Sequence, residues 1–429
     1  MSQGALRRVA VLGGVRTPFC RSNSLYADLT NLDLMNAAIQ GLADRYQLAG
    51  EHIDEVVGGA VVTHSKDWNI AREAVIGTSL KPTTPGITMM QACGTSLQAA
   101  AGIAAKIAAG QIECGIAMGS DTTSDPPIVF RRQAAQKFAA LGRARSTGEK
   151  LAVLQTMRPA DLSPQPPMVS EPRTGLSMGE HCELMAQEWR IPRVEQDQLA
   201  FESHSKAAQA YADGFMDDLI VPTAGVFRDN NIRMDASMEK LGALKAAYEK
   251  SDKGTLTAGN STPLTDGGAA VLLASEDWAM KHGLKPKATF VHAQHVALDF
   301  VKGEGLLMAP TLAVSKMLER AGLTLQDFDL YEIHEAFAAQ VLSTLRAWES
   351  AEYCKRLLGR DRPMGSIDRL KLNVRGSSLA FGHPFAATGA RVLGTLAELL
   401  AERGGRGLIS VCTAGGMGVA AILEGAKAA

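Results

Sequence analysis

The chain has 429 residues, of which 46% are hydrophobic and 21% are charged, and its formal net charge is −1 at pH 7. The apolar content excludes a disordered chain, and the length favours two or three domains. A charge this close to zero gives no general attraction to nucleic acid or to an anionic membrane, and no nucleic-acid-binding motif is present.

The six cysteines are widely spaced and form no Cys-x-x-Cys pair, so the sequence predicts neither a zinc site nor a disulfide framework. Reduced thiols in the cytoplasm are the better interpretation. The apolar segment near the N-terminus is too short for a secretory signal, and no apolar run is long enough to cross a membrane. Because no metal-ligand spacing or dinucleotide fingerprint is found, we expect no metal and no bound cofactor.

Hydrophobic periodicity predicts the same alternation of strands and helices twice along the chain. In the first half, strands are predicted at 8–13, 56–62 and 114–119, with helices at 32–46 and 96–109. In the second half, strands are predicted at 288–297, 330–334 and 408–411, with helices at 310–321 and 386–403. Such alternation favours largely parallel sheets covered on both faces, and the repetition predicts two similar α/β halves stacked on one another.

A long insertion, residues 124–253, separates the halves. It is basic between 126 and 159, with seven Lys or Arg residues against one acid, and an amphipathic helix follows at 195–213. The chain returns to the first half with a strand at 270–274. We therefore assign 1–123 and 254–280 to an N-terminal half, 124–253 to an inserted loop domain, and 281–429 to a C-terminal half.

The first candidate for chemistry is Cys93, in the segment QACGTSLQAA at 91–100. A turn at Gly94 opens there into a helix of small residues, so the sulfur is expected near free backbone N–H groups. These groups can lower a thiol pKa and can also hold an oxyanion. The alternative is a buried small residue in a tight turn.

Two further glycine-rich turns carry a histidine and a second thiol. The segment AFGHPFAATGAR at 380–391 places His383 between Gly382 and Pro384, which would hold the ring rigidly, as a general base needs. The segment VCTAGGMG at 411–418 places Cys412 at the end of a strand. A structural histidine and a buried cysteine are the alternatives. Together, two thiols and one imidazole suggest covalent acyl chemistry at sulfur.

These three segments resemble the active-site signatures of the thiolase family. The resemblance continues through RTPF at 16–19, NSTPLTDGG at 260–268 and HEAFA at 334–338, and therefore spans essentially the whole chain. Its order and spacing are specific, although each motif alone is weak. It implies a thiolase-like fold, with duplicated α/β halves stacked in α-β-α-β-α layers around the long insertion.

The resemblance also implies a role for each candidate residue. Cys93 would take the acyl group from a thioester, and His383 would activate Cys93 and help hold a thioester oxygen. Cys412 would move the Cα proton of the acetyl unit. The backbone N–H groups of Cys93 and Ala414 would form an oxyanion hole. A 3-oxoacyl-CoA would be cleaved in two half-reactions, with coenzyme A as a substrate and with ping-pong kinetics.

His334 is the main departure from the family pattern, which has Asn-Glu-Ala-Phe at this place. Histidine resembles the subgroup of trifunctional-complex thiolase subunits and their bacterial counterparts, and a neutral imidazole can donate one hydrogen bond into an oxyanion hole, directly or through water. Glu335 would support the site, or is a surface acid. The resemblance places Thr262 and Met178 beside the pantetheine of coenzyme A.

The resemblance further implies a homodimer or larger assembly, and association with a hydratase/dehydrogenase subunit of a β-oxidation complex. The basic stretch between Arg131 and Arg158 would meet coenzyme A phosphates, a partner subunit or a membrane surface, or is a solvated face. Fatty acid degradation in the cytoplasm is the expected setting.

Four functions compete at this point. The first is a 3-ketoacyl-CoA thiolase of the trifunctional type, and the second is a biosynthetic acetoacetyl-CoA thiolase with the same residues. A decarboxylating ketoacyl synthase is disfavoured because such enzymes have no catalytic thiol like Cys412. A non-enzymatic scaffold is disfavoured because every reactive position holds a competent residue.

Overall fold

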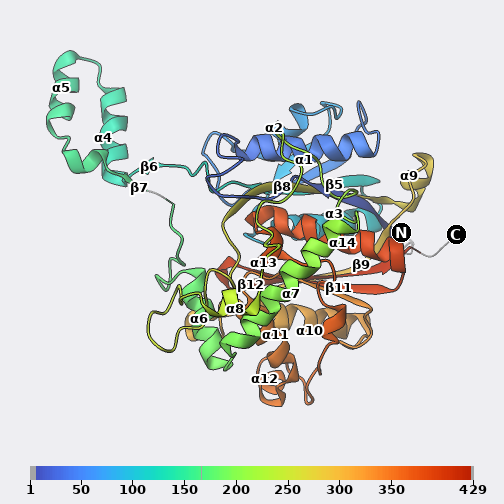
Figure 1. Cartoon of the computed structure of the whole chain (residues 1–429). Helices are drawn as coiled ribbons and strands as arrows, with labels where there is room; N and C mark the ends of the chain where they lie inside the picture. Colours follow the sequence, from blue (N-terminus) through green and yellow to red (C-terminus); the bar gives the residue numbers. More distant parts are fainter. Residues whose placement is uncertain (1–5, 166, 427–429) are drawn as a thin grey trace.

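The computed structural model describes residues 6–165 and 167–426 (Figure 1). The strands are β1 (Val9–Arg16), β2 (Cys20–Arg21), β3 (Glu55–Gly59), β4 (Gly86–Thr88), β5 (Cys114–Asp121), β6 (Val129–Phe130), β7 (Pro164–Gln165), β8 (Thr265–Ser275), β9 (Ala288–Ala297), β10 (Leu330–Ile333), β11 (Arg406–Thr413) and β12 (Met417–Gly425). The helices of the N-terminal half and the insertion are α1 (Asn31–Arg45), α2 (Ile70–Ile76), α3 (Thr95–Ala108), α4 (Arg132–Arg143), α5 (Thr147–Gln155), α6 (Met178–Glu188), α7 (Arg193–Ala212) and α8 (Met238–Gly242). The remaining helices are α9 (Glu276–Lys281), α10 (Ala309–Ala321), α11 (Ala338–Glu349), α12 (Ala351–Arg356), α13 (Ser378–Phe381) and α14 (Thr388–Arg403).

The chain builds the same strand arrangement twice. In the N-terminal half, β3 pairs parallel with β5, β5 antiparallel with β8, and β8 antiparallel with β1. In the C-terminal half, β10, β11, β12 and β9 pair in the same order and with the same directions. A short antiparallel contact between β1 and β9 joins the two sets into one ten-stranded sheet. The duplication predicted from the sequence is therefore present.

The elements lie in five layers, α-β-α-β-α (Figure 1). Helices α1 and α2 cover one outer face, α3 and α14 lie in the middle, and α10 and α11 cover the other outer face. The alternation of side chains along each strand explains how one strand serves two cores. In β8, Val271 faces the central core and Leu272 the outer core under α1, and in β11, Val411 faces the central core and Cys412 the core under α10 and α11.

The expectation of largely parallel sheets is wrong. Among the strands of the described residues, the parallel pairs are β3–β5 and β10–β11, whose connections contain α3 and α14, and β3–β4. The next strand in each half returns antiparallel. In the C-terminal half it does so through the short turn at Ala414–Gly416, which is too short for a crossover. In the N-terminal half the insertion occupies the equivalent connection between β5 and β8.

The insertion divides into two parts. Its first part is an arm in which the β6–β7 ribbon leads to α4 and α5, and Figure 1 shows this arm standing away from the body. Ala134 is the one buried residue of α4, and α5 has none. Its second part, α6 to α8, packs on the C-terminal half, where Met185, Leu199 and Leu241 join the core under α11. The helix predicted at 195–213 is α7.

Across residues 6–165 and 167–426, no helix is both long and apolar enough to span a bilayer.

The first turns of α3 and α14 approach each other closely in the central layer. A Cβ atom at Gly389 would overlap the backbone nitrogen of Leu97, which cannot move aside without shifting α3. We expect Gly389→Ala to lower the free energy of unfolding by about 1–3 kcal/mol, as overpacking does. Gly102→Ala in α3 is the matched control, because a Cβ there meets no atom within 4 Å. Denaturant midpoints measure both variants, and equal midpoints would contradict the close approach.

Candidate active site

Cys93 lies in a strained turn immediately before α3. Ala92 precedes it with φ of 46°, a left-handed conformation that is uncommon for a residue with a side chain and is often found at functional sites. A Cβ at Gly94 would approach the side chains of Thr413 and Val419, so glycine lets the Cys93 turn contact the β11–β12 turn. Cys93 alone among the six cysteines is partly exposed, and the other five are buried.

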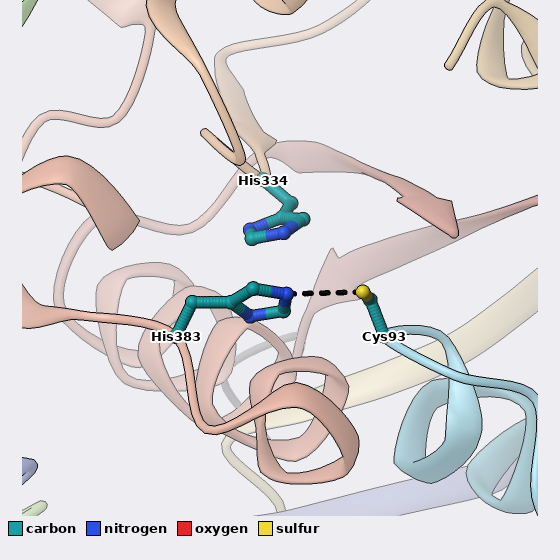
Figure 2. Close-up of side chains that lie close together, drawn as sticks. All are labelled: Cys93, His334 and His383. Carbon is teal, nitrogen blue, oxygen red and sulfur yellow. Dashed lines mark hydrogen bonds between the residues drawn. The ribbon is translucent and has the colours of Figure 1, made fainter. Parts of the chain in front are cut away.

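His383 is held from both sides of its ring and from its backbone. Its Nε2 lies 3.0 Å from the Cys93 sulfur, as Figure 2 shows, and its Nδ1 lies 2.6 Å from Thr388 Oγ1. Its backbone N–H donates to Thr265 Oγ1 at 2.7 Å. Gly382, with φ of 100°, makes the turn that brings the ring to this position. Thr388 can accept from the Nδ1–H, which leaves the Nε2 lone pair free to accept the thiol proton.

His334 lies beside this pair, at the end of β10. Its ring centroid is 4.1 Å from that of His383 (Figure 2), and the side chain is fully buried. Its Nδ1 lies 2.8 Å from Ser378 Oγ, whereas its buried Nε2 has no hydrogen-bond partner in the structure. A buried polar atom without a partner is costly, and it is the kind of group that a ligand oxygen can satisfy.

A buried guanidinium, that of Arg391, is hydrogen-bonded to the hydroxyl partner of His334. Arg391 donates to Ser378 Oγ at 2.6 Å through Nη2 and to Ser377 Oγ at 3.1 Å through Nη1. Because the oxygen of Ser378 already accepts from a guanidinium, its own proton can be donated to His334 Nδ1. That arrangement places the ring proton on Nε2, the ring nitrogen without a hydrogen-bond partner.

Glu335 is buried, so the alternative of a surface acid is wrong. Its carboxylate accepts from Ser203 Oγ at 2.8 Å, Asn373 Nδ2 at 2.7 Å and the backbone N–H of Leu379 at 3.2 Å. Burial raises its pKa. These bonds join the end of β10 to the segment that carries Ser378, and so fix His334 relative to its hydroxyl partner.

The environment favours an uncharged thiol and an uncharged imidazole. Burial raises the pKa of Cys93 to about 12, although the backbone N–H of Ala414 and that of Cys93 itself act to lower it. Burial, together with the charge of Arg391, lowers the pKa of His383 to about 3. The helix N-terminus therefore does not make Cys93 a resting thiolate, and proton transfer to His383 must accompany attack.

Cys412 lies close to this site but is only 1% exposed. Burial raises its pKa well above the usual range, and the charge that Cys93 would carry as a thiolate raises it further. In the described part of the chain, no hydrogen bond joins Cys412 to Cys93 or His383. Ala414, two residues further on, directs its backbone N–H toward Cys93.

A cavity of about 310 Å³ lies on the side of α8 and the segment before β8, and none of Cys93, His334, His383 and Cys412 lines it. Leu379, which follows Ser378, lines it, as do Ser261 and Pro263. Thr262 lies between them, but its hydroxyl donates to Ala336 O at 3.0 Å, and Met178 is not among the lining residues. Three cations line the cavity, Arg21, Arg233 and Lys240, together with Asp235, whose carboxylate accepts from Lys240 Nζ at 2.5 Å.

Sequence reasoning missed the residues that orient the two rings. Thr388 follows His383 by five positions inside the same motif, Arg391 is the last residue of that motif, and Ser378 lies two positions before it. The available signal was therefore the presence of hydroxyl and guanidinium groups around a candidate base. The cations of the cavity were also missed. The basic stretch at 131–158, which was expected to meet coenzyme A phosphates among other partners, lies on the arm away from the body (Figure 1).

Comparisons with known proteins agree with the geometry. Two family models match, "Thiolase, N-terminal domain" over residues 9–277 and "Thiolase, C-terminal domain" over residues 284–425. The 3-ketoacyl-CoA thiolases of Aliivibrio fischeri and Vibrio cholerae are each 42% identical over 424 residues. The match covers 97% of this chain, with 95% and 97% of those proteins respectively.

Two solved structures have similar folds, each with a TM-score of 0.81. The Bacillus anthracis acetyl-CoA acetyltransferase is 30% identical, over 98% of this chain and 100% of that one. The human mitochondrial 3-ketoacyl-CoA thiolase is 27% identical, over 99% and 100%.

The raised pKa of Cys93 has a measurable consequence. Iodoacetamide should modify Cys93 before the five buried thiols, and its rate should keep rising up to pH 9, because the reactive thiolate becomes more abundant as pH approaches a pKa near 12. Peptide mapping with timed quenching measures this rate, and Cys93→Ala is the control. A plateau below pH 7 would contradict an uncharged resting pair.

Proposed function

The chain belongs to the thiolase family, and on that premise we propose that it is a 3-ketoacyl-CoA thiolase, an acyltransferase that cleaves a 3-oxoacyl-CoA with coenzyme A. The observation that carries the proposal is the 3.0 Å contact between His383 Nε2 and the one partly exposed thiol, Cys93. Relatives with this printed name are 42% identical over 97% of the chain.

The first half-reaction begins at Cys93. As its sulfur attacks the 3-oxo carbon, the thiol proton passes to His383 Nε2, and Thr388 stabilises the resulting ring through Nδ1. The bond between Cα and Cβ then breaks. Its electron pair goes to Cα, which is protonated by the Cys412 thiol, and acetyl-CoA leaves while the acyl chain remains on Cys93. The raised pKa of Cys412 supports its role as an acid that keeps its proton until a carbanion forms.

Two sets of donors can hold the oxygen atoms that become negative. The thioester oxygen of the departing acetyl unit would accept from His334 Nε2–H and from protonated His383, which accounts for the unpartnered nitrogen at this position. The oxygen on the carbon bound to Cys93 would accept from the backbone N–H groups of Cys93 and Ala414, which already favour negative charge at the sulfur.

In the second half-reaction the Cys412 thiolate takes the thiol proton of coenzyme A, and the coenzyme A sulfur attacks the acyl carbon. The bond from that carbon to Cys93 breaks, and the Cys93 sulfur recovers its proton from His383.

We propose that coenzyme A occupies the cavity beside Leu379, with its phosphates near Arg21, Arg233 and Lys240. Thr262 and Met178 would lie along the pantetheine path, Thr262 acting through the turn that it stabilises. The reaction as proposed uses coenzyme A as a substrate, with no resident cofactor and no metal.

The same residues would also run the condensation of two acetyl-CoA molecules, as an acetyl-CoA C-acetyltransferase. The similarity to the Bacillus anthracis acetyl-CoA acetyltransferase supports this second function, and the higher identity of the 3-ketoacyl-CoA thiolases favours the first. A preference for long-chain over four-carbon substrates would separate them.

We also propose a setting for the activity: fatty acid β-oxidation in the cytoplasm, by a homodimer or larger assembly. Strand β4 ends the sheet with a free edge and is followed by the exposed side chain of Met90, which supports pairing with a second copy there. The arm exposes the apolar side chains of Phe130, Leu151 and Leu154 among its basic residues. This combination favours contact with a hydratase/dehydrogenase subunit or with an anionic membrane surface. Light scattering and co-purification at low salt test these assemblies.

Substitution of each thiol should give a different kinetic defect. Cys93→Ala should abolish thiolysis of acetoacetyl-CoA and of a long-chain 3-oxoacyl-CoA, because no acyl-enzyme can form. Cys412→Ala should lower kcat by about 100-fold or more, and it should still form the acyl-enzyme from acetyl-CoA. Cys354→Ser, a buried thiol outside the site, is the control and should keep wild-type kcat. Unchanged turnover in Cys93→Ala would overturn the proposal.

Ser378 should act as a positioning residue for His334. Ser378→Ala removes the hydroxyl at Nδ1 and should lower kcat by about tenfold or more with little change in KM, because the Nε2 proton is no longer directed at the oxyanion. Ser378→Thr keeps the hydroxyl and should restore most of the rate. Ser377→Ala is the matched control, since Ser377 binds the same guanidinium without touching His334. Equal losses in Ser377→Ala and Ser378→Ala would indicate a purely structural role.

A further inference from the structure

Three metal-ligating atoms converge within the site. The Cys93 sulfur and one ring nitrogen each of His334 and His383 all lie within 4.8 Å of one another (Figure 2). The three residues come from separate parts of the chain: the turn before α3, the end of β10 and the turn before α14. Among residues 6–165 and 167–426, this is the one group of His, Cys, Asp or Glu side chains found with such spacing.

The remaining ring nitrogens are already occupied, as they are in metal sites. His383 Nδ1 is held by Thr388 Oγ1 at 2.6 Å, and His334 Nδ1 by Ser378 Oγ at 2.8 Å. A hydrogen bond at the second nitrogen fixes the ring of a metal-bound histidine and raises its basicity. Both Nε2 atoms are therefore the ones presented to a ligand, and that of His334 is buried and without a partner.

The donor set selects the class of metal. One thiolate and two imidazoles suit Zn²⁺, and three protein ligands with an open fourth position for water form a familiar zinc geometry. Bond lengths of about 2.1 Å to nitrogen and about 2.3 Å to sulfur imply ligand separations of roughly 3.3–3.6 Å. The 3.0 Å between His383 Nε2 and Cys93 Sγ lies near that range, and small side-chain movements would bring in His334.

We propose that Cys93, His334 and His383 form a reversible Zn²⁺ site that inhibits the enzyme by occupying its nucleophile and its base. On binding, the Cys93 S–H bond breaks and its proton goes to solvent as the Zn–S bond forms. His334 presents its Nε2 lone pair, so its ring proton moves to Nδ1 and is donated to Ser378 Oγ, which can accept as well as donate. No oxidation or reduction takes place.

The histidine at 334 makes this site specific to chains of this kind. An amide side chain at the same place offers a weak oxygen ligand, so only one thiolate and one imidazole would remain. A zinc ion can reach the Cys93 sulfur from solvent, because Cys93 is the one cysteine that is partly exposed. The affinity for zinc is measured without substrate, so its outcome does not depend on whether the proposed acyl transfer is correct.

Calorimetric titration of the full-length protein with ZnCl₂ tests the site. We expect one Zn²⁺ per chain, with release of about one proton, read from buffers of different ionisation enthalpy. His334→Asn should weaken binding by at least about tenfold, and Cys93→Ala by more. His52→Asn, a partly exposed histidine beside Asp54, is the control for surface binding and should leave the affinity unchanged.

Cobalt supplies a second readout that needs no variant. Co²⁺ added to the wild-type protein should give a thiolate-to-cobalt charge-transfer band, which prior alkylation of Cys93 by iodoacetamide should prevent. Zinc should inhibit thiolysis, and a chelator should restore it. The proposal is overturned if one zinc binds equally well to wild type, Cys93→Ala and His334→Asn, or if cobalt gives no thiolate band. A wild-type protein that binds no zinc but catalyses thiolysis fully would overturn the metal site and leave the proposed function intact.

Discussion

The contact between the first turns of α3 and α14 sets the geometry on which the site depends. Ser96 Oγ donates to Ala386 O at 2.6 Å and accepts from the backbone N–H of Ala390 at 2.8 Å, so one side chain of the Cys93 helix holds both ends of the turn that follows His383. Gly389 allows the helices to come this close. Asp121, at the end of β5, accepts from the Ala386 N–H at 2.8 Å and holds the same turn from the sheet. A thiol and an imidazole separated by 290 positions in the chain are thereby held 3.0 Å apart.

Burial of the reacting groups fits the finding that both imidazole rings are hydrogen-bonded to hydroxyl groups and not to carboxylates. A charged pair would be costly in this environment, and the pKa directions of Cys93 and His383 both favour the neutral forms. Thr388 and Ser378 can accept or donate, so they can follow a proton as it moves between ring nitrogens without a net charge being buried. The same adaptability lets His334 serve as a hydrogen-bond donor to an oxyanion or as a ligand to zinc.

Sequence alone predicted the duplicated halves and the family, because the motifs that contain Cys93, His383 and Cys412 occur in a specific order and spacing, although each motif alone is weak. Sheet direction was predicted wrongly, since the short turn at 414–416 and the long insertion both return the chain antiparallel, and helical periodicity says nothing of that. The hydrogen bonds of the network around His334 were not predictable either, because Ser378 on α13 meets both Arg391 on α14 and His334 after β10 only in the folded chain. The arm was identified by its charge, but its separation from the body is a tertiary property that composition does not encode.

The most direct test of the central claim is the identity of the residue that carries the acyl group during turnover. Rapid mixing with acetyl-CoA, acid quenching and peptide mass analysis should place one acetyl group on the peptide that contains Cys93, and added coenzyme A should remove it. Acetylation at Cys412 or at any other residue, or sustained turnover with Cys93 unmodified, would contradict the account.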